Sequence, residues 1–444
     1  MKSFIQSTNQ ACGVFCEYDF GFKDQFCFTD LFQKAMQRPL TVCKVSFSES
    51  DVQEIIARCR LLRSLEFWDA VMMIGAAESV CDEFILKCQP KALIAPRIDT
   101  YLLDILERKL LLANIPYIGV WRSAFVKNRF FLTNRGEHCI ACTSNTTEIH
   151  DFIQSVGSFE FRATSLSNNK YSTRSLYAAH GKRMVRDVCL ESLRRVHSFK
   201  FGYREMATGF HVNDYRVPPT TWKGDFQNLS ASKKILSDLR PRVFVALQVN
   251  PESTIDYYSR NIDLIDIPKT LVKVVTTCLN NGFQVVIKDH PNMFGRRNYQ
   301  FINKLCKLKE VYLLDNNLPS TEIVTSCDVV FTWSGTIAVQ AFFAGIPSIS
   351  VCSPFGLQLP GYNIVNSTVE IATVLKHLKM GESKNAIQES DKIKLAQHIL
   401  NAHLEGEVFT HDKRQPNVIK FVEWIDANIE KISVRNGKIR LNLF

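Results

Sequence analysis

The sequence predicts an α/β protein with two halves, each built around a parallel sheet. Strand-like and helical segments alternate before residue 161 and again after residue 242, which is typical of βαβ units. The composition, 46% hydrophobic and 22% charged residues, is that of a globular chain. At 444 residues the chain is too long for one core and suits two domains of roughly 150–200 residues each.

The first half alternates as βαβ units require. Apolar runs predict strands, and runs with Leu and Ile at helical spacing predict helices. We expect strands at 70–76, 91–96 and 115–121, and helices at 79–89 and 100–115.

The second half repeats the pattern more clearly. We expect Gly282 and Gly345 to end helices. The predicted strands are 243–249, 284–288, 311–315, 328–333 and 348–352, and the predicted helices are 268–282, 296–310, 320–327 and 336–345. From about residue 385 onward the pattern predicts two or three further helices. The domain limits that follow are 1–160 for the first half, 161–242 for a connector, 243–385 for the second half and 386–444 for the helical tail.

The stretch from Val329 to Cys352 is strongly apolar, and no charged residue occurs between Asp328 and Glu370. Its length would permit a membrane-spanning helix. However, glycine and proline divide it into short pieces with different periods, which favours a buried strand–helix–strand unit.

The cysteines and the N-terminus both favour a cytoplasmic protein. The fourteen cysteines are scattered, and Cys306, Cys327 and Cys352 lie in apolar runs, which indicates free thiols. No apolar segment follows the lysine of MKSFIQSTNQ, so we expect no secretory signal.

The net charge of +10 comes from residues 161–242, which hold 16 Lys/Arg and six Asp/Glu, while the rest of the chain holds 38 of each sign. Either these cations lie on solvated helix faces, or they form a basic surface for a polyanionic glycan, lipid phosphates or an anionic membrane leaflet. Nucleic acid is not expected, because no binding module is recognisable. The candidate residues for such a surface are Arg183, Arg186, Arg194 and Arg195.

The stretch VVIKDHPN ends a predicted strand on Lys288, Asp289 and His290, followed by Pro291. In open α/β sheets, ligands lie outside the carboxyl ends of the strands. A histidine in this position is either a ligand-binding group or a structural hydrogen-bonding group. A second motif one strand–helix–strand unit later favours the first alternative.

That second motif is TWSGT, in which Ser334 and Gly335 turn the chain and Thr336 opens a helix. Hydroxyls and free N–H groups at a helix start can bind an anion, and a glycine permits close approach of the backbone. Alternatively, Ser334 or Thr336 caps the helix. Together with KDHP, the motif predicts a nucleotide phosphate site.

A third stretch at the same sheet edge is LQVNPEST. Gln248, Glu252, Ser253 and Thr254 follow the first strand of the second half. A carboxylate there could hold a sugar or ribose hydroxyl, or it could cap the next helix. Both alternatives stay open.

Together, LQVNPEST, VVIKDHPNMFGRR and CDVVFTWSGTIAVQAFFAGIPSISV resemble the C-terminal half of bacterial capsule and surface-polysaccharide glycosyltransferases of the GT-B fold. This group includes Kdo (3-deoxy-manno-octulosonic acid) transferases and is similar to bacterial polysialyltransferases. The resemblance implies two Rossmann-like domains facing a cleft, with C-terminal helices. It also implies a CMP-sugar donor held by an HP motif and a Ser/Thr motif, here His290, Pro291, Ser334 and Thr336.

The chain departs from that family at two points. Gln340 stands where the family often has a glutamate that grips ribose, so Gln340 is expected at the donor site with a changed role. No Asp-Asp/Glu-Gly stretch is present to supply the base used by related sialyltransferases. The absence of a DxD pair argues against metal-dependent transfer, and we expect neither a metal nor a cofactor besides the nucleotide sugar.

Glycosyl transfer needs charge stabilisation on the leaving phosphate and a carboxylate near the reacting carbon or hydroxyl. His290, Lys288 and the helix after SGT are predicted to supply the first. For the second, the candidates are Asp99 after the strand at 91–96 and Glu137 in the RGE turn, which also resembles related proteins. Asp99 has an alternative role as an N-cap, and Glu137 could be an exposed turn residue.

The sequence therefore predicts a metal-independent glycosyltransferase that moves Kdo or another CMP-activated acidic sugar to a surface polysaccharide or lipid-linked glycan. We expect it in the cytoplasm or at the inner face of the cytoplasmic membrane. Two alternatives are a nucleotide-sugar 2-epimerase on the same fold and a non-catalytic glycan-binding protein. A nicotinamide dehydrogenase is disfavoured, because no GxGxxG follows a strand.

Overall fold

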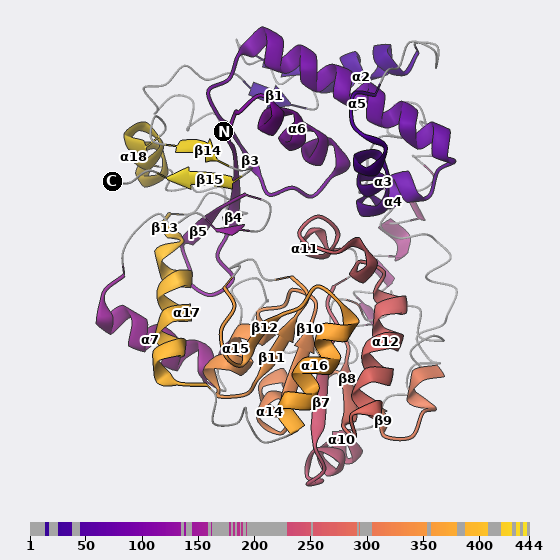
Figure 1. Ribbon diagram of the computed structural model, residues 1–444, viewed down its shortest axis with the longest axis vertical. Helices are drawn as coiled ribbons and strands as arrows, with labels where there is room; N and C mark the ends of the chain where they lie inside the picture. The colour runs from indigo at the N-terminus through magenta and orange to yellow at the C-terminus, as the bar shows by residue number, and fades with distance from the viewer. Residues whose placement is uncertain are drawn as a thin grey trace. The chain divides into compact units, whose positions relative to one another are not determined.

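The computed structural model forms two compact units (Figure 1). Described residues within 1–142 and 401–444 make up the first unit, and those within 143–195 and 209–400 the second. The connector predicted at 161–242 lies mostly outside the described residues, so the predicted domain limits stay predictions. The structure describes residues 14–16, 25–37, 45–134, 137–138, 144–158, 161, 177–178, 181–182, 184–186, 188–189, 192, 229–249, 252–290, 293, 304–352, 357–379, 387–406, 419–428, 432–435 and 438–441.

The first unit combines a mixed sheet with several helices. Its elements are β1 (Val14–Cys16), β2 (Gln25–Cys27), α2 (Phe28–Met36), α3 (Glu49–Arg58), α4 (Arg60–Arg63), α5 (Phe67–Cys88), β3 (Leu93–Pro96), α6 (Tyr101–Leu112), β4 (Tyr117–Arg122), β5 (Arg129–Asn134), β6 (Glu137–His138), β13 (His403–Glu405), α18 (Ile419–Asn428), β14 (Ile432–Arg435) and β15 (Lys438–Leu441).

The main sheet of the first unit has the order β13-β5-β4-β3, with β6 paired to β5. Its β3–β4 pair is parallel, as the predicted βαβ pattern requires. The pairs β4–β5, β5–β6 and β13–β5 are antiparallel, so the prediction of a parallel sheet was wrong for them. A direct return from β4 to β5 explains the difference, because no helix intervenes between these strands to carry the chain back.

The strand predicted at 70–76 was wrong, because this segment lies inside the 22-residue helix α5. Most of its buried residues follow the helical spacing of three or four positions, and Gly75, Ala76 and Glu78 between them are buried as well. Those with the helical spacing include Ala70, Met73, Ile74, Ala77, Val80, Cys81 and Phe84. The apolar run therefore reflects a helix with a broad buried face.

The second unit is a doubly wound α/β domain. Its elements are α7 (Thr146–Gly157), α10 (Leu229–Leu236), β7 (Arg242–Ala246), α11 (Ser253–Asp256), η5 (Ile262–Leu264), α12 (Ile267–Asn280), β8 (Gln284–Lys288), β9 (Val311–Leu313), α14 (Ser320–Thr325), β10 (Val329–Thr332), α15 (Ile337–Phe343), β11 (Ser348–Ser350), β12 (Tyr362–Ile364), α16 (Thr368–Lys379) and α17 (Glu389–Asn401).

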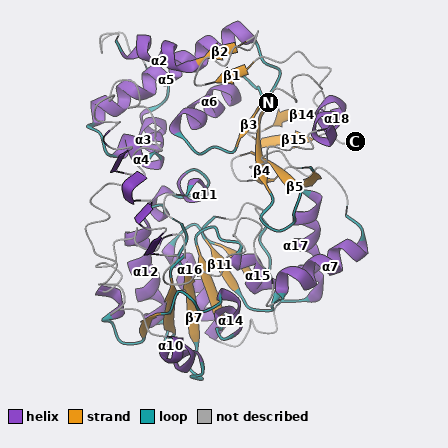
Figure 2. Ribbon diagram, turned by 180° about the vertical axis from the view of Figure 1, so that it is seen from behind, coloured by secondary structure: helices purple, strands orange, loops and turns teal. Residues whose placement is uncertain are grey.

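The six strands of this unit are all parallel, in the order β12-β11-β10-β7-β8-β9. They are labelled in Figure 1, and Figure 2 shows the sheet from behind with its strands in orange. After β7 the chain adds β8 and β9 on one side, and then it returns to add β10, β11 and β12 on the other. Numbered from β7, this is the order 3-2-1-4-5-6 of Rossmann domains. The α/β class predicted from the sequence is thus confirmed. The direction of winding changes between β7 and β10.

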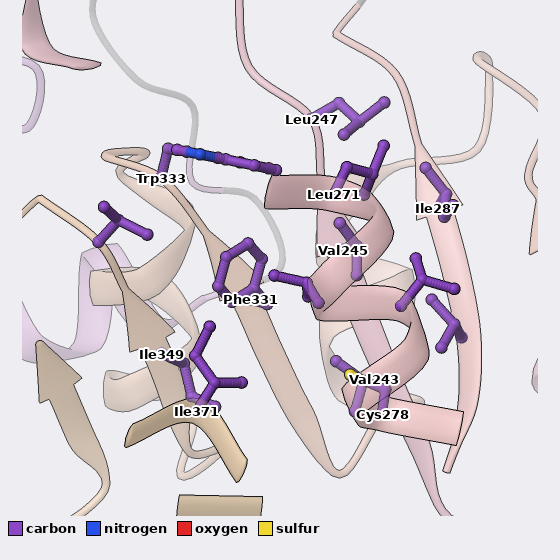
Figure 3. Packing of buried hydrophobic residues seen from close by; sticks show 14 of the residues in the cluster. Val243, Val245, Leu247, Leu271, Cys278, Ile287, Phe331, Trp333, Ile349 and Ile371 are labelled. Carbon is purple, nitrogen blue, oxygen red and sulfur yellow. The ribbon is translucent and has the colours of Figure 1, made fainter. Parts of the chain in front are cut away.

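Alternation along the strands divides the core between the two faces of this sheet. Val243 and Val245 pack with Ile287, Phe331 and residues of α12 and α16 on one face (Figure 3). Phe244, Val286 and Val330 pack with residues of α10, α14 and α15 on the other. Because both faces are buried, the strands read as continuous apolar runs.

The apolar stretch 329–352 is β10, α15 and β11, which confirms the predicted strand–helix–strand unit. Among the described residues, no helix is both long and apolar enough to cross a membrane. The cysteines described here, including Cys278, Cys327 and Cys352, are free thiols, as expected.

The C-terminal prediction was partly wrong. Two of the expected helices are present as α17 and α18, but β13, β14 and β15 follow or flank them. β13 pairs with β5, more than 260 positions earlier in the sequence. Such a distant pairing leaves no local signal. The helix predicted at 296–310 lies mostly outside the described residues.

Arg242 is a buried cation, 2% exposed, at the start of β7. It links neighbouring segments at the amino end of this strand. Its Nη1 donates to the carbonyl oxygens of Leu236 at 2.9 Å and Ser326 at 2.7 Å, and its Nη2 donates to that of Asp238 at 2.6 Å. The guanidinium therefore joins α10, β7 and the turn after α14 through backbone groups.

We expect Arg242→Met to lower the free energy of unfolding by about 3 kcal/mol or more, because buried carbonyls lose charge-assisted hydrogen bonds. Arg240→Met is the matched control, since Arg240 is half exposed and pairs with surface carboxylates. Chemical denaturation of both variants measures the difference. Equal losses in the two variants would contradict the structural role of Arg242.

Candidate functional site

The candidate site lies where the second sheet changes its direction of winding. In Rossmann-type sheets, the ligand crevice is outside the carboxyl ends of the strands at this point. Gln248 lies two residues beyond the end of β7, and Ser334 lies two residues beyond the end of β10. The structure thus places residues from two of the three predicted stretches at this position, although 86 residues separate them in the sequence.

Gln248 and Ser334 are joined by two hydrogen bonds. The Oε1 atom of Gln248 accepts from the backbone N–H of Ser334 at 2.8 Å and from its hydroxyl at 3.1 Å. A backbone N–H can only donate, so the amide orientation of Gln248 is fixed by its partner. The Gln248 side chain is buried. Both polar hydrogens of Ser334 are therefore directed toward one oxygen atom.

Thr254 completes this cluster. Its Oγ1 lies 2.7 Å from the Oγ of Ser334, and the residue is buried in the short helix α11. The sequence placed Thr254 at this sheet edge but not among the binding residues. Glu252 occupies the N-cap position of α11, and its side chain makes no capping bond. The alternative of a side-chain cap at Glu252 is therefore wrong.

Gly335 is explained by a close contact within the protein. A Cβ atom at this position would lie 2.8 Å from Nε2 of Gln248 and 3.0 Å from Oγ1 of Thr332. Its backbone is not in the left-handed region, so space and not conformation requires glycine. The sequence predicted a close approach to a ligand at Gly335, and in the structure the Gln248 amide occupies that space.

Thr336 holds the N-cap position of α15 but makes no side-chain capping bond. The alternative that Thr336 is merely a cap is therefore wrong. The helix itself is only seven residues long. Gln340 lies one turn further on, where its N–H donates to the carbonyl of Thr336 at 3.0 Å. Both residues are half-buried, and residues four apart lie on one helix face.

The neighbouring strand β8 ends on the predicted polar cluster. Lys288 is buried, and its Nζ lies 3.2 Å from the hydroxyl of Ser320 at the start of α14. Desolvation lowers the pKa of Lys288 to about 8, against the raising effect of Asp289 and Asp315. A proton therefore leaves this amine more easily than an exposed lysine.

Asp289 is buried, and its Oδ1 accepts from the N–H of His290 at 2.8 Å. This bond fixes the backbone at the strand end. His290 is half-buried, and its carbonyl accepts from the N–H of Met293 at 2.8 Å. The structure thus holds the His290 backbone on both sides, while Pro291 lies outside the described residues.

In the first unit, Asp99 is exposed between β3 and α6. Thr100 caps α6, because its Oγ1 accepts from the N–H of Leu103 at 3.3 Å. The alternative role of Asp99 as the N-cap is therefore wrong. Glu137 lies in β6, but its side chain is outside the described part of the chain.

The predicted basic surface is mostly outside the described part of the chain. Arg186 is described and exposed, whereas Arg183, Arg194 and Arg195 are not described. Within the described residues, no group of three or more His, Cys, Asp or Glu side chains could hold a metal ion.

We expect Gly335→Ala to lower the free energy of unfolding by roughly 1–3 kcal/mol, because its Cβ overlaps a buried amide. Gln248→Ala should also destabilise, since it removes the acceptor for Ser334. The double variant should lose at least about 0.5 kcal/mol less than the sum, because removal of the amide makes room for the new methyl group. Chemical denaturation of the four proteins measures this coupling, and additive losses would contradict it.

No protein-family model and no curated protein sequence matches the chain. Among solved structures, it is similar to KpsC of Thermosulfurimonas dismutans, a β-Kdo 2,4-transferase (12% identity, TM-score 0.33, 75% of this chain and 86% of that chain covered). It is also similar to the β-Kdo 2,7-transferase KpsC of that organism (12% identity, TM-score 0.34, 86% and 96% covered). A third similar structure is UDP-GlcNAc 2-epimerase of Neisseria meningitidis bound to UDP-GlcNAc (11% identity, TM-score 0.25, 74% and 80% covered). The chain is thus similar to sugar transferases and to a sugar-nucleotide epimerase, while its own strand order defines the fold described above.

Proposed function

We propose that the protein is a glycosyltransferase whose second unit binds a nucleotide sugar outside the carboxyl ends of β7, β8 and β10. The observation that carries this proposal is the meeting of Gln248, Thr254 and Ser334 at the point where the sheet changes its winding. Rossmann-type sheets bind nucleotides at that point.

The Ser334 donors suggest how a phosphate would be held. Its N–H and hydroxyl now converge on the Oε1 atom of Gln248. A phosphate oxygen that took the place of this amide oxygen would meet the same two donors. Hydrogen bonds to a charged acceptor are about twice as strong as those to a neutral amide. A phosphate can therefore compete for the position.

His290 supports the same site from the adjacent strand. It follows β8, which pairs directly with β7, so His290 lies one strand away from Gln248 at the same edge. A half-buried imidazole there can donate a hydrogen bond to the phosphate as negative charge develops on it. We assign it to stabilisation of the leaving group, together with Lys288 through its charge.

The transfer step needs one further group. An acceptor hydroxyl oxygen forms a bond to the anomeric carbon of the donor, while the bond between that carbon and the phosphate oxygen breaks and leaves the nucleotide. The hydroxyl proton passes to a carboxylate. Asp99 and Glu137 are the candidates from the first unit. Retention of configuration would instead make one carboxylate a nucleophile.

The donor and acceptor follow from the sequence resemblance given above. We propose a CMP-activated acidic sugar such as Kdo as donor, and a surface polysaccharide or lipid-linked glycan as acceptor. Arg183, Arg186, Arg194 and Arg195 are proposed to face that acceptor or an anionic membrane surface, since residues 161–242 carry the surplus of positive charge.

CMP, UDP, GDP and their sugar conjugates should be compared by thermal unfolding. A bound nucleotide stabilises the folded state, and the shift grows with concentration above the dissociation constant. We expect CMP or a CMP-sugar to raise the unfolding temperature of the wild-type protein, and His290→Ala to remove most of the shift. His377→Ala is the matched control, because His377 is an exposed histidine on α16 of the same unit.

The proposal is contradicted if no nucleotide stabilises the wild-type protein. It is also contradicted if His290→Ala and His377→Ala retain the same shift. A response to UDP or GDP in place of CMP would keep the transferase and correct the donor.

A further inference from the structure

The first unit presents a row of planar side chains on one face of its sheet. The parallel register pairs Pro96 of β3 with Val120 of β4, so the next residues, Arg97 and Trp121, lie opposite each other. The guanidinium carbon of Arg97 is 4.2 Å from the centre of the Trp121 ring. This distance is within the range of a cation–π contact.

The row continues across the sheet. Trp121 is the register partner of Phe131 in β5, and Phe131 is the register partner of His403 in β13. The rings of Phe131 and His403 are stacked, with centroids 4.0 Å apart. Register partners point to the same face. Arg97 therefore lies at the end of a register row of rings contributed by three strands, β4, β5 and β13.

Arg97 has an unusual environment for a half-buried guanidinium. Its ring contact is to Trp121, and it forms no hydrogen bond or ion pair with the part of the chain that the structure describes. Asp99 acts on it electrostatically without forming an ion pair. Five N–H donors are thus fixed in place at the carboxyl end of a parallel strand pair, where ligands of α/β sheets bind.

We propose that Arg97 binds the carboxylate of an acidic sugar. Stacking on Trp121 pre-orients the planar fork, and such a fork matches the two oxygens of a carboxylate. The role of that sugar as the acceptor rests on the proposed function, whereas carboxylate binding does not.

The position of Arg97 suggests what this contact does. Arg97 and Asp99 flank Ile98, which is 1% exposed and anchors the segment. A sugar whose carboxylate is held by Arg97 brings its hydroxyls toward Asp99, the candidate base. Arg97 is therefore a specificity residue that selects acidic acceptors, and it is distinct from the nucleotide site on the second unit.

The test is an NMR titration of the full-length protein with D-glucuronate, D-glucose and inorganic phosphate. The variants are Arg97→Met, which keeps the stem of the side chain, and Arg97→Lys, which keeps the charge but loses the fork. Arg63→Met, an exposed arginine of the same unit, is the matched control. Thermal unfolding shows whether each variant is folded.

We expect the wild-type protein and Arg63→Met to bind glucuronate at least about tenfold more tightly than glucose, a difference of about 1.4 kcal/mol. Arg97→Met should lose this preference, and Arg97→Lys should lose part of it. Equal binding of glucuronate by the wild-type protein and Arg97→Met would overturn the proposal. So would binding of phosphate that is as tight as that of glucuronate.

A CMP titration of the same samples separates the two proposals. If Arg97→Met leaves CMP binding unchanged and the wild-type protein does not prefer glucuronate to glucose, only the proposed acidic-sugar site is contradicted. If the wild-type protein prefers glucuronate through Arg97 but binds no nucleotide, the proposed function is contradicted and the carboxylate site at Arg97 is retained.

Discussion

The second unit depends on one contact across the point where its sheet reverses direction. β7 and β10 are neighbours in the sheet, but the chain adds β8 and β9 on one side of β7 before it returns to form β10 on the other side. The Gln248 amide links the segments that follow β7 and β10. An unpaired N–H at Ser334 in this position would be costly. The internal amide satisfies it, and Gly335 leaves the room that the amide needs. The Gln248 amide therefore determines both which donors of Ser334 are engaged at this edge of the sheet and why residue 335 is glycine.

This arrangement has a consequence for ligand binding. The N–H and the hydroxyl of Ser334 already converge on Oε1 of Gln248 in the absence of a ligand. Ligand binding therefore does not require these donors to rearrange. The ligand must instead displace or share an amide oxygen. Charged acceptors gain more from these donors than a neutral amide does, which favours anions over neutral groups. The first unit offers a different kind of preorganisation, in which the Trp121 ring orients the Arg97 guanidinium and the stacked rings of Phe131 and His403 follow in the same register row.

The second unit could be predicted well from the sequence, because each of its strands is a short apolar run between helical segments. The location of its polar edge followed from the rule for carboxyl ends of parallel strands. The bond between Gln248 and Ser334 could not be predicted, because it depends on the strand order, which the sequence does not state. The segment 70–76 was misassigned as a strand because it is the part of the 22-residue helix α5 that is buried on most sides, and a short apolar run does not distinguish a buried strand from a buried helix. The row of rings next to Arg97 could not be predicted either, because His403 of β13 pairs with Phe131 of β5 although the two residues are far apart in the sequence.

The central claim is that a nucleotide binds outside β7 and β10 of the second unit. Hydrogen–deuterium exchange with and without CMP tests it most directly, because it reports protection amide by amide. We expect slower exchange in peptides that cover 247–254 and 332–340, with no change in peptides from α16. Protection confined to the first unit, or unchanged exchange in both of these peptides at saturating nucleotide, would contradict it.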